Sequence, residues 1–276
     1  MHIRKTLLVT LFSVLAAGAA PALAQQDDME WQRNCERQAQ RSERAVACQV
    51  RPLTTTMAAG ALSVDAGQNG GISVAGSTAR TGSDVRFSAR IQAQAATAER
   101  AAEIADAVRI RATPGRISAE GLVTYSGESW TVSYHVEVPG EANLELQAVN
   151  GPLAVRDVNG RIRAVTVNGP VVLDNLAGEV HVRAQNGPLT VRLAGARWDG
   201  AGLDAETRNG PVSISMPDGY SAALETGTVN GPMSTSIPLT VVGQVRRGGY
   251  IRTTLGSGGA PIRVVTTNGP ATIRSR

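Results

Sequence analysis

The stretch Asn150-Gly-Pro-Leu-Ala-Val-Arg-Asp-Val-Asn159-Gly-Arg-Ile-Arg-Ala-Val-Thr-Val-Asn168-Gly-Pro contains three asparagine–glycine pairs, nine residues apart. Eight of the eleven asparagines in the chain are followed by glycine, and six of these pairs are followed by proline. Both residues tolerate positive φ, so each pair is typical of a tight turn between strands. The pairs begin at Asn69, Asn150, Asn159, Asn168, Asn186, Asn209, Asn230 and Asn268. A turn signal at a near-constant interval predicts stacked repeats, and a structural role for these asparagines is preferred over a binding role.

Apolar residues occupy fixed positions after each turn. Counted from the asparagine, the third position is apolar in six units, and positions five and eight extend the same row. Alternation of this kind is typical of a strand with one buried face. The third-position residues are Leu153, Ile162, Val171, Leu189, Val212 and Met233. We expect these positions to point into a core, together with fifth-position residues such as Val155.

Two nine-residue units make one coil of about eighteen residues. Later coils lengthen to 23 and 21 residues, and the last interval of 38 residues fits two further coils of nineteen. Stacking at ~4.8 Å per layer would bury the apolar faces, and roughly six or seven coils would give a rod on the order of 30 Å long. The predicted fold class is an all-β β-solenoid with coils of about 18–23 residues and Asn-Gly turns.

The segment before the regular coils, residues 47–142, is less periodic. Thr97 can cap a helix, and apolar residues at helical spacing from Ala101 to Val108 predict one short helix over 97–108. Short alternating runs elsewhere predict strands. These runs cover residues 62–64, 72–74, 85–91, 109–112, 117–120 and 130–138.

The first residues have the pattern of an export signal. Arg4 and Lys5 precede the apolar run 6–20, and Ala22-Leu-Ala24 precedes a predicted cleavage site after Ala24. The run is too short for a transmembrane helix, and no later stretch is long enough. Removal of Arg4 and Lys5 lowers the net charge from +4 to +2 and leaves a chain without lysine. We therefore expect an exported protein.

Two cysteines, Cys35 and Cys48, follow the predicted signal. An even number in an exported chain predicts one disulfide, with two free thiols as the alternative. In one straight helix they would lie roughly 20 Å apart, so a helix must end between them. We expect a helix over about 29–44 and Cys48 on the following strand. The predicted organisation is a signal at 1–24, a helical segment at 25–46 and a β domain at 47–276, regular from 143 onward.

The motifs along the chain resemble a bacterial family of unknown function labelled putative adhesin. The residues that carry the resemblance are the Cys48 strand, Asn69-Gly-Gly-Ile72, the Trp130 strand ending at Pro139, the Asn-Gly turns, Trp198-Asp-Gly, Asp218-Gly-Tyr220 and Leu255-Gly-Ser-Gly-Gly259. The resemblance covers most of residues 47–276. It implies a β-solenoid of exported proteins and supplies no catalytic residues.

The sharpest functional candidate is an insertion in the longest interval between neighbouring Asn-Gly pairs from Asn150 to Asn230. Extra residues in a repeat map to loops on one face. Carboxylates beside an aromatic ring could bind sugar, and a carboxylate pair can hydrolyse a glycoside. The preferred interpretation is that Trp198 fills core and the acids are solvated, because no partner acid is identifiable. The candidate residues are Trp198, Asp199, Asp204, Glu206 and Arg208.

Other residue types give weaker signals. Arg156, Arg192 and Arg274 each lie six residues after an asparagine, but Asp174 occupies the same position, so a mixed solvated row is expected. The two histidines of the mature chain, His135 and His181, have no metal-ligand spacing. Arginine is interspersed with acids, which argues against a nucleic-acid partner. Aromatic residues make up only 3% of the chain, few for a sugar-stacking surface. No cofactor or metal is expected.

The function that fits best is a non-enzymatic, exported binding or scaffold module at the cell surface or in the periplasm. The main alternative is a carbohydrate-active enzyme that cleaves polysaccharides through the insertion at 198–208. A third is a periplasmic structural or envelope-stress protein. The sequence is compatible with a glycan or a surface protein as the partner. It is also compatible with a homodimer formed through an uncapped end coil.

Overall fold

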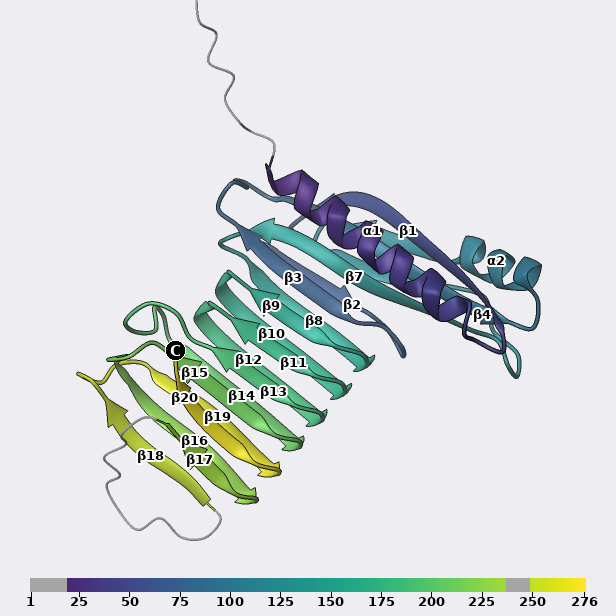
Figure 1. The fold of residues 1–276 in the computed structure, drawn as a ribbon. Coiled ribbons are helices and arrows are strands. Elements are labelled where there is room, and N and C mark those ends of the chain that lie inside the picture. The colour runs from purple at the N-terminus through teal and green to yellow at the C-terminus, as the bar shows by residue number, and fades with distance from the viewer. Residues whose placement is uncertain (1–18, 237–248) are drawn as a thin grey trace, which may run out of the picture.

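The computed structural model describes residues 19–236 and 249–276, and these form an all-β structure with two ten-stranded sheets and two helices (Figure 1). The two sheets face each other and enclose the apolar core. Most of the predicted export signal, residues 1–18, lies outside the described residues. No helix in the described part of the chain is long and apolar enough to cross a membrane.

The first sheet contains, in spatial order, β1 (Ala45–Thr56), β4 (Asp84–Ala95), β7 (Ser129–Pro139), β3 (Ile72–Ser77), β9 (Leu153–Arg156), β11 (Val171–Asp174), β13 (Leu189–Arg192), β15 (Val212–Met216), β20 (Ala271–Ser275) and β17 (Met233–Thr235). The second sheet contains β18 (Gly249–Leu255), β16 (Ala222–Asn230), β19 (Pro261–Asn268), β14 (Gly202–Asn209), β12 (Ala177–Asn186), β10 (Asn159–Asn168), β8 (Asn143–Asn150), β2 (Ala61–Asp65), β6 (Arg116–Glu120) and β5 (Arg109–Thr113). From β8 to β15 the chain alternates between the sheets.

The strands of this regular part pair in parallel, and the offset between partners lengthens to 23 residues at β14 and β15. Leu144 lies beside Ile162, and Ile162 lies beside Val180, so the offset is eighteen residues in the first rungs. The third and fifth positions face the core as predicted in most units; Leu153 and Val155, for example, are at most 1% exposed. After Asn230 the prediction is wrong, since Met233 is only half-buried and Thr235 is exposed. The nine-residue spacing therefore places like residues on top of one another.

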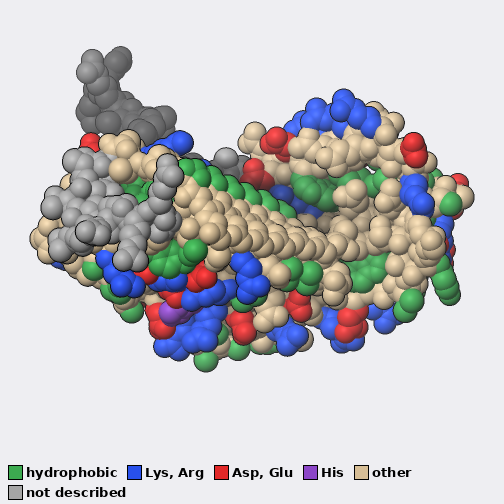
Figure 2. All heavy atoms as spheres, turned by 90° about the horizontal axis from the view of Figure 1, so that it is seen from below, with side chains coloured by type: hydrophobic (Ala, Val, Ile, Leu, Met, Phe, Trp, Pro, Cys, Tyr) green, Lys and Arg blue, Asp and Glu red, His purple; other side chains and the backbone are tan. Residues whose placement is uncertain are grey.

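Seven of the eight Asn-Gly asparagines form one hydrogen-bonded ladder along the edge where these strands turn. Each side-chain Nδ2 donates to the Oδ1 of the next asparagine at 2.7–3.0 Å, always toward Asn69. The order is Asn69, Asn150, Asn168, Asn186, Asn209, Asn268 and Asn230. Figure 2 shows regular rows of tan atoms, which are backbone and uncharged polar side chains, across the middle of the molecule. The asparagines of this ladder are structural, and Asn159 lies outside it.

The C-terminal strands are not stacked in chain order. The intervals after Asn209 predict successive coils ending at Asn268, but β19 and β20 insert between β14 and β16 and between β15 and β17. Consequently Asn268 lies between Asn209 and Asn230 in the ladder. The prediction failed here because every rung has the same Asn-Gly-Pro turn, so the spacing cannot specify which rung stacks on which.

An N-terminal cap closes one end of the stack. Helix α1 (Ala19–Ala39) lies along β1 and β4 in Figure 1, and β1, β4 and β7 pair antiparallel. The predicted disulfide between Cys35 and Cys48 is present, with a Cα–Cα distance of 6.2 Å. The helix predicted over 29–44 instead spans Ala19–Ala39. It ends earlier than predicted because the chain must reverse before β1 to bring Cys48 beside Cys35. The second predicted helix is confirmed as α2 (Ala98–Ala107), with Thr97 as its cap.

Candidate functional site: a charged row on the second sheet

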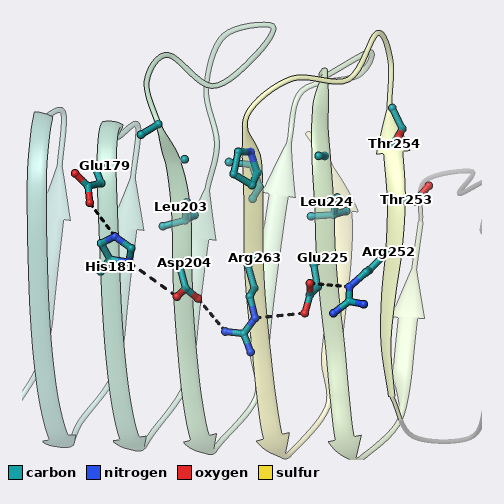
Figure 3. A pocket seen from close by; sticks show the side chains of 15 residues that line it. Glu179, His181, Leu203, Asp204, Leu224, Glu225, Arg252, Thr253, Thr254 and Arg263 are labelled. Atoms are coloured by element: carbon teal, nitrogen blue, oxygen red, sulfur yellow. Dashed lines mark hydrogen bonds and ion pairs between the residues drawn. The ribbon is translucent and has the colours of Figure 1, made fainter.

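A row of charged side chains crosses five neighbouring strands on the outer face of the second sheet. His181 of β12, Asp204 of β14, Arg263 of β19, Glu225 of β16 and Arg252 of β18 occupy one register position (Figure 3). Their neighbours along each strand are buried, and all of these except Thr226 and Thr253 are apolar, so alternation directs the five residues outward. We call these five residues the charged row.

Arg263 is the centre of the charged row. Its Nη1 donates to Asp204 Oδ1 at 2.8 Å and to Glu206 Oε2 at 2.9 Å, and its Nε donates to Glu225 Oε1 at 3.3 Å. The guanidinium also lies 5.7 Å from the ring centroid of Tyr250. Three carboxylates on two other strands are therefore held by one planar group, whose fixed donors suit this arrangement.

Further ion pairs extend the charged row in both directions. Arg252 donates from Nε to Glu225 at 2.9 Å. At the other end, His181 Nε2 lies 3.2 Å from Glu179 Oε1, and its Nδ1 lies 3.9 Å from Asp204. Arg161 on β10 donates to Glu179 at 3.1 Å. Opposite charges in adjacent positions across strands stabilise the pairing and fix the side chains.

The arginines keep the carboxylates ionised. Partial burial raises the pKa of Asp204, but hydrogen bonds from Arg183 and Arg263 outweigh it, and its pKa lies below the usual range. The hydrogen bond from Arg252 lowers the pKa of Glu225. Burial opposes the charge of Arg263, but its carboxylate partners raise its pKa. At neutral pH these carboxylates and arginines are all charged.

All five residues of the charged row line a depression of about 720 Å³ (Figure 3). Gly202, Ala223, Pro261, Glu179 and Thr254 are among the other residues that line it. Gly202 has φ +133°, and a Cβ there would lie 2.5 Å from the carbonyl oxygen of Pro261. Because only glycine fits at this point, the backbone itself lines the depression there.

The structure separates the candidate residues at 198–208. Trp198 is 6% exposed and donates from Nε1 to the Gly178 carbonyl at 3.0 Å, which agrees with the preferred core interpretation. The backbone of Asp199 accepts a hydrogen bond from Gly178, and its side chain is exposed, as is that of Arg208. Asp204 and Glu206 lie on the outer face of the second sheet that carries the charged row, which we call the charged face. Trp198 is thus no aromatic wall beside these carboxylates.

The other sequence candidates have structural positions. Asp174 lies in register between Arg156 and Arg192, with Arg192 Nη1 3.5 Å from Asp174, so the expected mixed row is present on the first sheet. Arg274 continues this row beyond Ser215. His135 lies on the outer side of β7 and is buried there, and burial lowers its pKa.

The sequence did not reveal the charged row. Arg263, Glu225 and Arg252 come together only because β19 inserts beside β14 and β18 pairs antiparallel with β16. The one available signal was a charged residue at an outward position of each alternating run. In the described residues no group of three histidines, cysteines or carboxylates could hold a metal ion.

Comparisons with known proteins add two structural similarities. No family model matches the chain, and no curated protein matches it. A crystal structure named a putative cell adhesion protein, from Clostridium sporogenes, covers 84% of this chain and 100% of its own length at 8% identity, with a TM-score of 0.39. One named a putative adhesin, from Bacteroides fragilis, covers 83% of this chain and 97% of its own at 9% identity, with a TM-score of 0.31.

Proposed function

We propose that this protein is an exported, non-enzymatic binding and scaffold module of the putative-adhesin type, at the cell surface or in the periplasm. We further propose that the stack from β8 to β20 is a β-solenoid, a rod that holds surface side chains at constant spacing. The observation that carries the proposal is the charged row. It crosses five strands on an outer face, and ion pairs hold its side chains in place.

The state of the carboxylates favours binding over glycoside cleavage. A glycosidase needs one carboxyl group that retains its proton, which requires a raised pKa. The pKa values of Asp204 and Glu225 are instead lowered. Fixed charges of both signs, spaced by the strands, suit a partner with complementary charges and chiefly determine its orientation and specificity.

A swap of the two partners of one ion pair tests the charged face and keeps that pair intact. Arg161 and Glu179 pair across β10 and β12, and exchanging them as Arg161→Glu with Glu179→Arg keeps the pair while reversing the order of charge. The matched control exchanges Asp174 and Arg192, which pair across β11 and β13 on the other sheet. Labelled mature protein is applied to bacterial cells and to immobilised matrix proteins and polysaccharides.

We expect the wild type and the control swap to bind the same surface equally, and the swap on the charged face to bind several-fold more weakly. The proposal would be contradicted if both swaps bound as the wild type does. Circular dichroism of the two variants checks that each retains the β structure.

The enzymatic alternative depends on Asp204 and Glu206, alternate residues of β14 that point to the same face and share Arg263. Its test replaces Asp199, Asp204 and Glu206 by the corresponding amides and measures the release of reducing ends from a polysaccharide panel. Activity that disappears in the triple variant would favour this alternative over the binding proposal. Activity that survives all three changes would exclude these residues as its site.

A further inference from the structure

A second pocket lies at the opposite end of the regular stack, between the two sheets. It has a volume of about 400 Å³, within the range of small-molecule sites. Three parts of the chain line it: the end of β2 with the following loop 66–69, the middle of β6, and the start of β7 with Thr124 of the preceding loop. It shares no lining residue with the depression lined by the charged row.

One aromatic side chain forms part of the wall and is held in place. The Trp130 Nε1 donates to the Leu122 carbonyl at 3.0 Å. A Cβ on Gly121 would lie 2.5 Å from Trp130 Cε2, so glycine allows the loop to lie against this edge of the indole. The hydrogen bond and the close loop fix the ring before any ligand arrives, which reduces the entropy lost on binding.

Most of the polar side-chain atoms that line this pocket have no hydrogen-bond partner among the described residues, in contrast to those of the charged row. Asp65 accepts from the Gly67 amide with Oδ1 at 2.8 Å, which leaves Oδ2 available. Within the described residues, the other polar side chains of the wall donate no hydrogen bond that would occupy them. They are Gln68, Asn69, Ser118, Thr124 and Ser129. Hydroxyl and amide groups can both donate and accept, so the wall offers both kinds of partner.

Asn69 is the terminal member of the asparagine ladder. Its Oδ1 accepts a hydrogen bond from Asn150 at 3.0 Å. Because every bond of the ladder is donated toward Asn69, the Nδ2 of Asn69 is the last donor group of the ladder and has no further asparagine to donate to. Aligned hydrogen bonds polarise one another, which makes the terminal donor stronger than an isolated amide. The ladder therefore delivers a polarised donor to the wall of the pocket.

We propose that this pocket binds a neutral saccharide. A sugar ring combines an apolar C–H face with a rim of hydroxyl groups, and the pocket combines one fixed indole with several free donors and acceptors. Asp65 is the one charged residue among those that line it, so an anionic sugar would meet a like charge. The inference concerns a different site from the charged face and does not depend on the function proposed for that face.

The test titrates the mature protein with glucose, galactose, mannose, N-acetylglucosamine and cellobiose, and follows saturation transfer to the sugar by NMR. We expect at least one of these sugars to bind at millimolar concentration and glucuronic acid to bind at least about fivefold more weakly, because of the charge of Asp65. Absence of saturation transfer to every neutral sugar would overturn the proposal, and so would equal binding of glucuronic acid.

Variants locate the site. Ser118→Ala with Ser129→Ala removes two hydroxyls from the wall and should weaken binding about tenfold. The matched control is Ser213→Ala on the outer face of the first sheet, which should leave binding unchanged. Equal loss in both, or in neither, would contradict the assigned pocket. Trp130→Phe should also weaken binding, and the serine variants keep the test valid if this change disturbs the fold.

Discussion

The regular stack and the N-terminal cap are built on different principles. In the stack, each rung from β8 to β15 repeats the same contacts: inward residues lie on inward residues, and asparagine bonds to asparagine. In the cap, β1, β4 and β7 pair antiparallel, two helices pack against β1 and β4, and a disulfide joins α1 to β1. A repeated unit predicts which of its residues face the core, whereas a cap is specified by contacts that occur only once.

A charge placed inside one rung should have the largest effect. Val155 is 1% exposed and lies between Val74 and Leu173 in the register. Val155→Asp buries an unpaired carboxylate and should lower the free energy of unfolding by about 4 kcal/mol or more, measured by urea denaturation. Ala154→Asp, one position along on the outer side, should cost far less. Similar losses for the two variants would mean that the inward register is wrong.

Removal of the disulfide should cause the second-largest loss of stability, and this loss should be located in the cap. Cys35 and Cys48 close a loop with a sequence separation of 13. Cys35→Ser with Cys48→Ser should cost about 3 kcal/mol by the loop-entropy argument. Hydrogen exchange should rise in α1 and β1 and stay slow in β10 and β12. Equal acceleration in both regions would contradict a cap that is stabilised separately from the stack.

A single rung of the asparagine ladder should contribute less. Asn186 donates to Asn168 and accepts from Asn209, at 2.8 Å in each case. Asn186→Ala breaks both bonds and should lower the melting temperature through a loss of about 1–2 kcal/mol. Asn159→Ala is the control, because Asn159 has the same Asn-Gly context without a place in the ladder, and it should be nearly neutral. The reverse order of the two effects would contradict a stabilising role for the ladder, since Asn159 begins strand β10 and has no ladder bond.

Acidification should give the smallest effect, from the charged row. The folded protein lowers the pKa of Asp204 and of Glu225 from ordinary values of 3.8 and 4.5. The contribution of these two carboxylates to the free energy of unfolding is complete at a pH above their ordinary pKa values. It is lost as the pH falls through their lowered pKa values in the folded protein. We expect a loss of about 1 kcal/mol in total below pH 4.5. Glu225→Gln should remove part of this dependence. A pH profile identical to the wild type would contradict the pairing with Arg252 and Arg263.

The sequence was most informative where it repeats. The inward positions, the strand starts after each turn, the helix at 98–107 and the disulfide could all be predicted, because each depends on local spacing or on a single pair of residues. The insertion of β19 between β14 and β16 could not be predicted, because similar turns do not specify the order in which the strands stack. The charged row depends on that insertion. The pocket at Trp130 was missed because a low aromatic content says nothing about where one tryptophan lies.

The most direct test of the functional account is protease treatment of cells that produce the protein, probed with an antibody to the mature chain. The treatment is applied to intact cells, to cells with a permeabilised outer membrane and to lysed cells, with marker proteins for each compartment. An exported protein should be digested before the cytoplasmic membrane is broken. A surface module should be digested in intact cells, and a periplasmic one only after the outer membrane is permeabilised. Protection until the cells are lysed would contradict export and with it the proposed function.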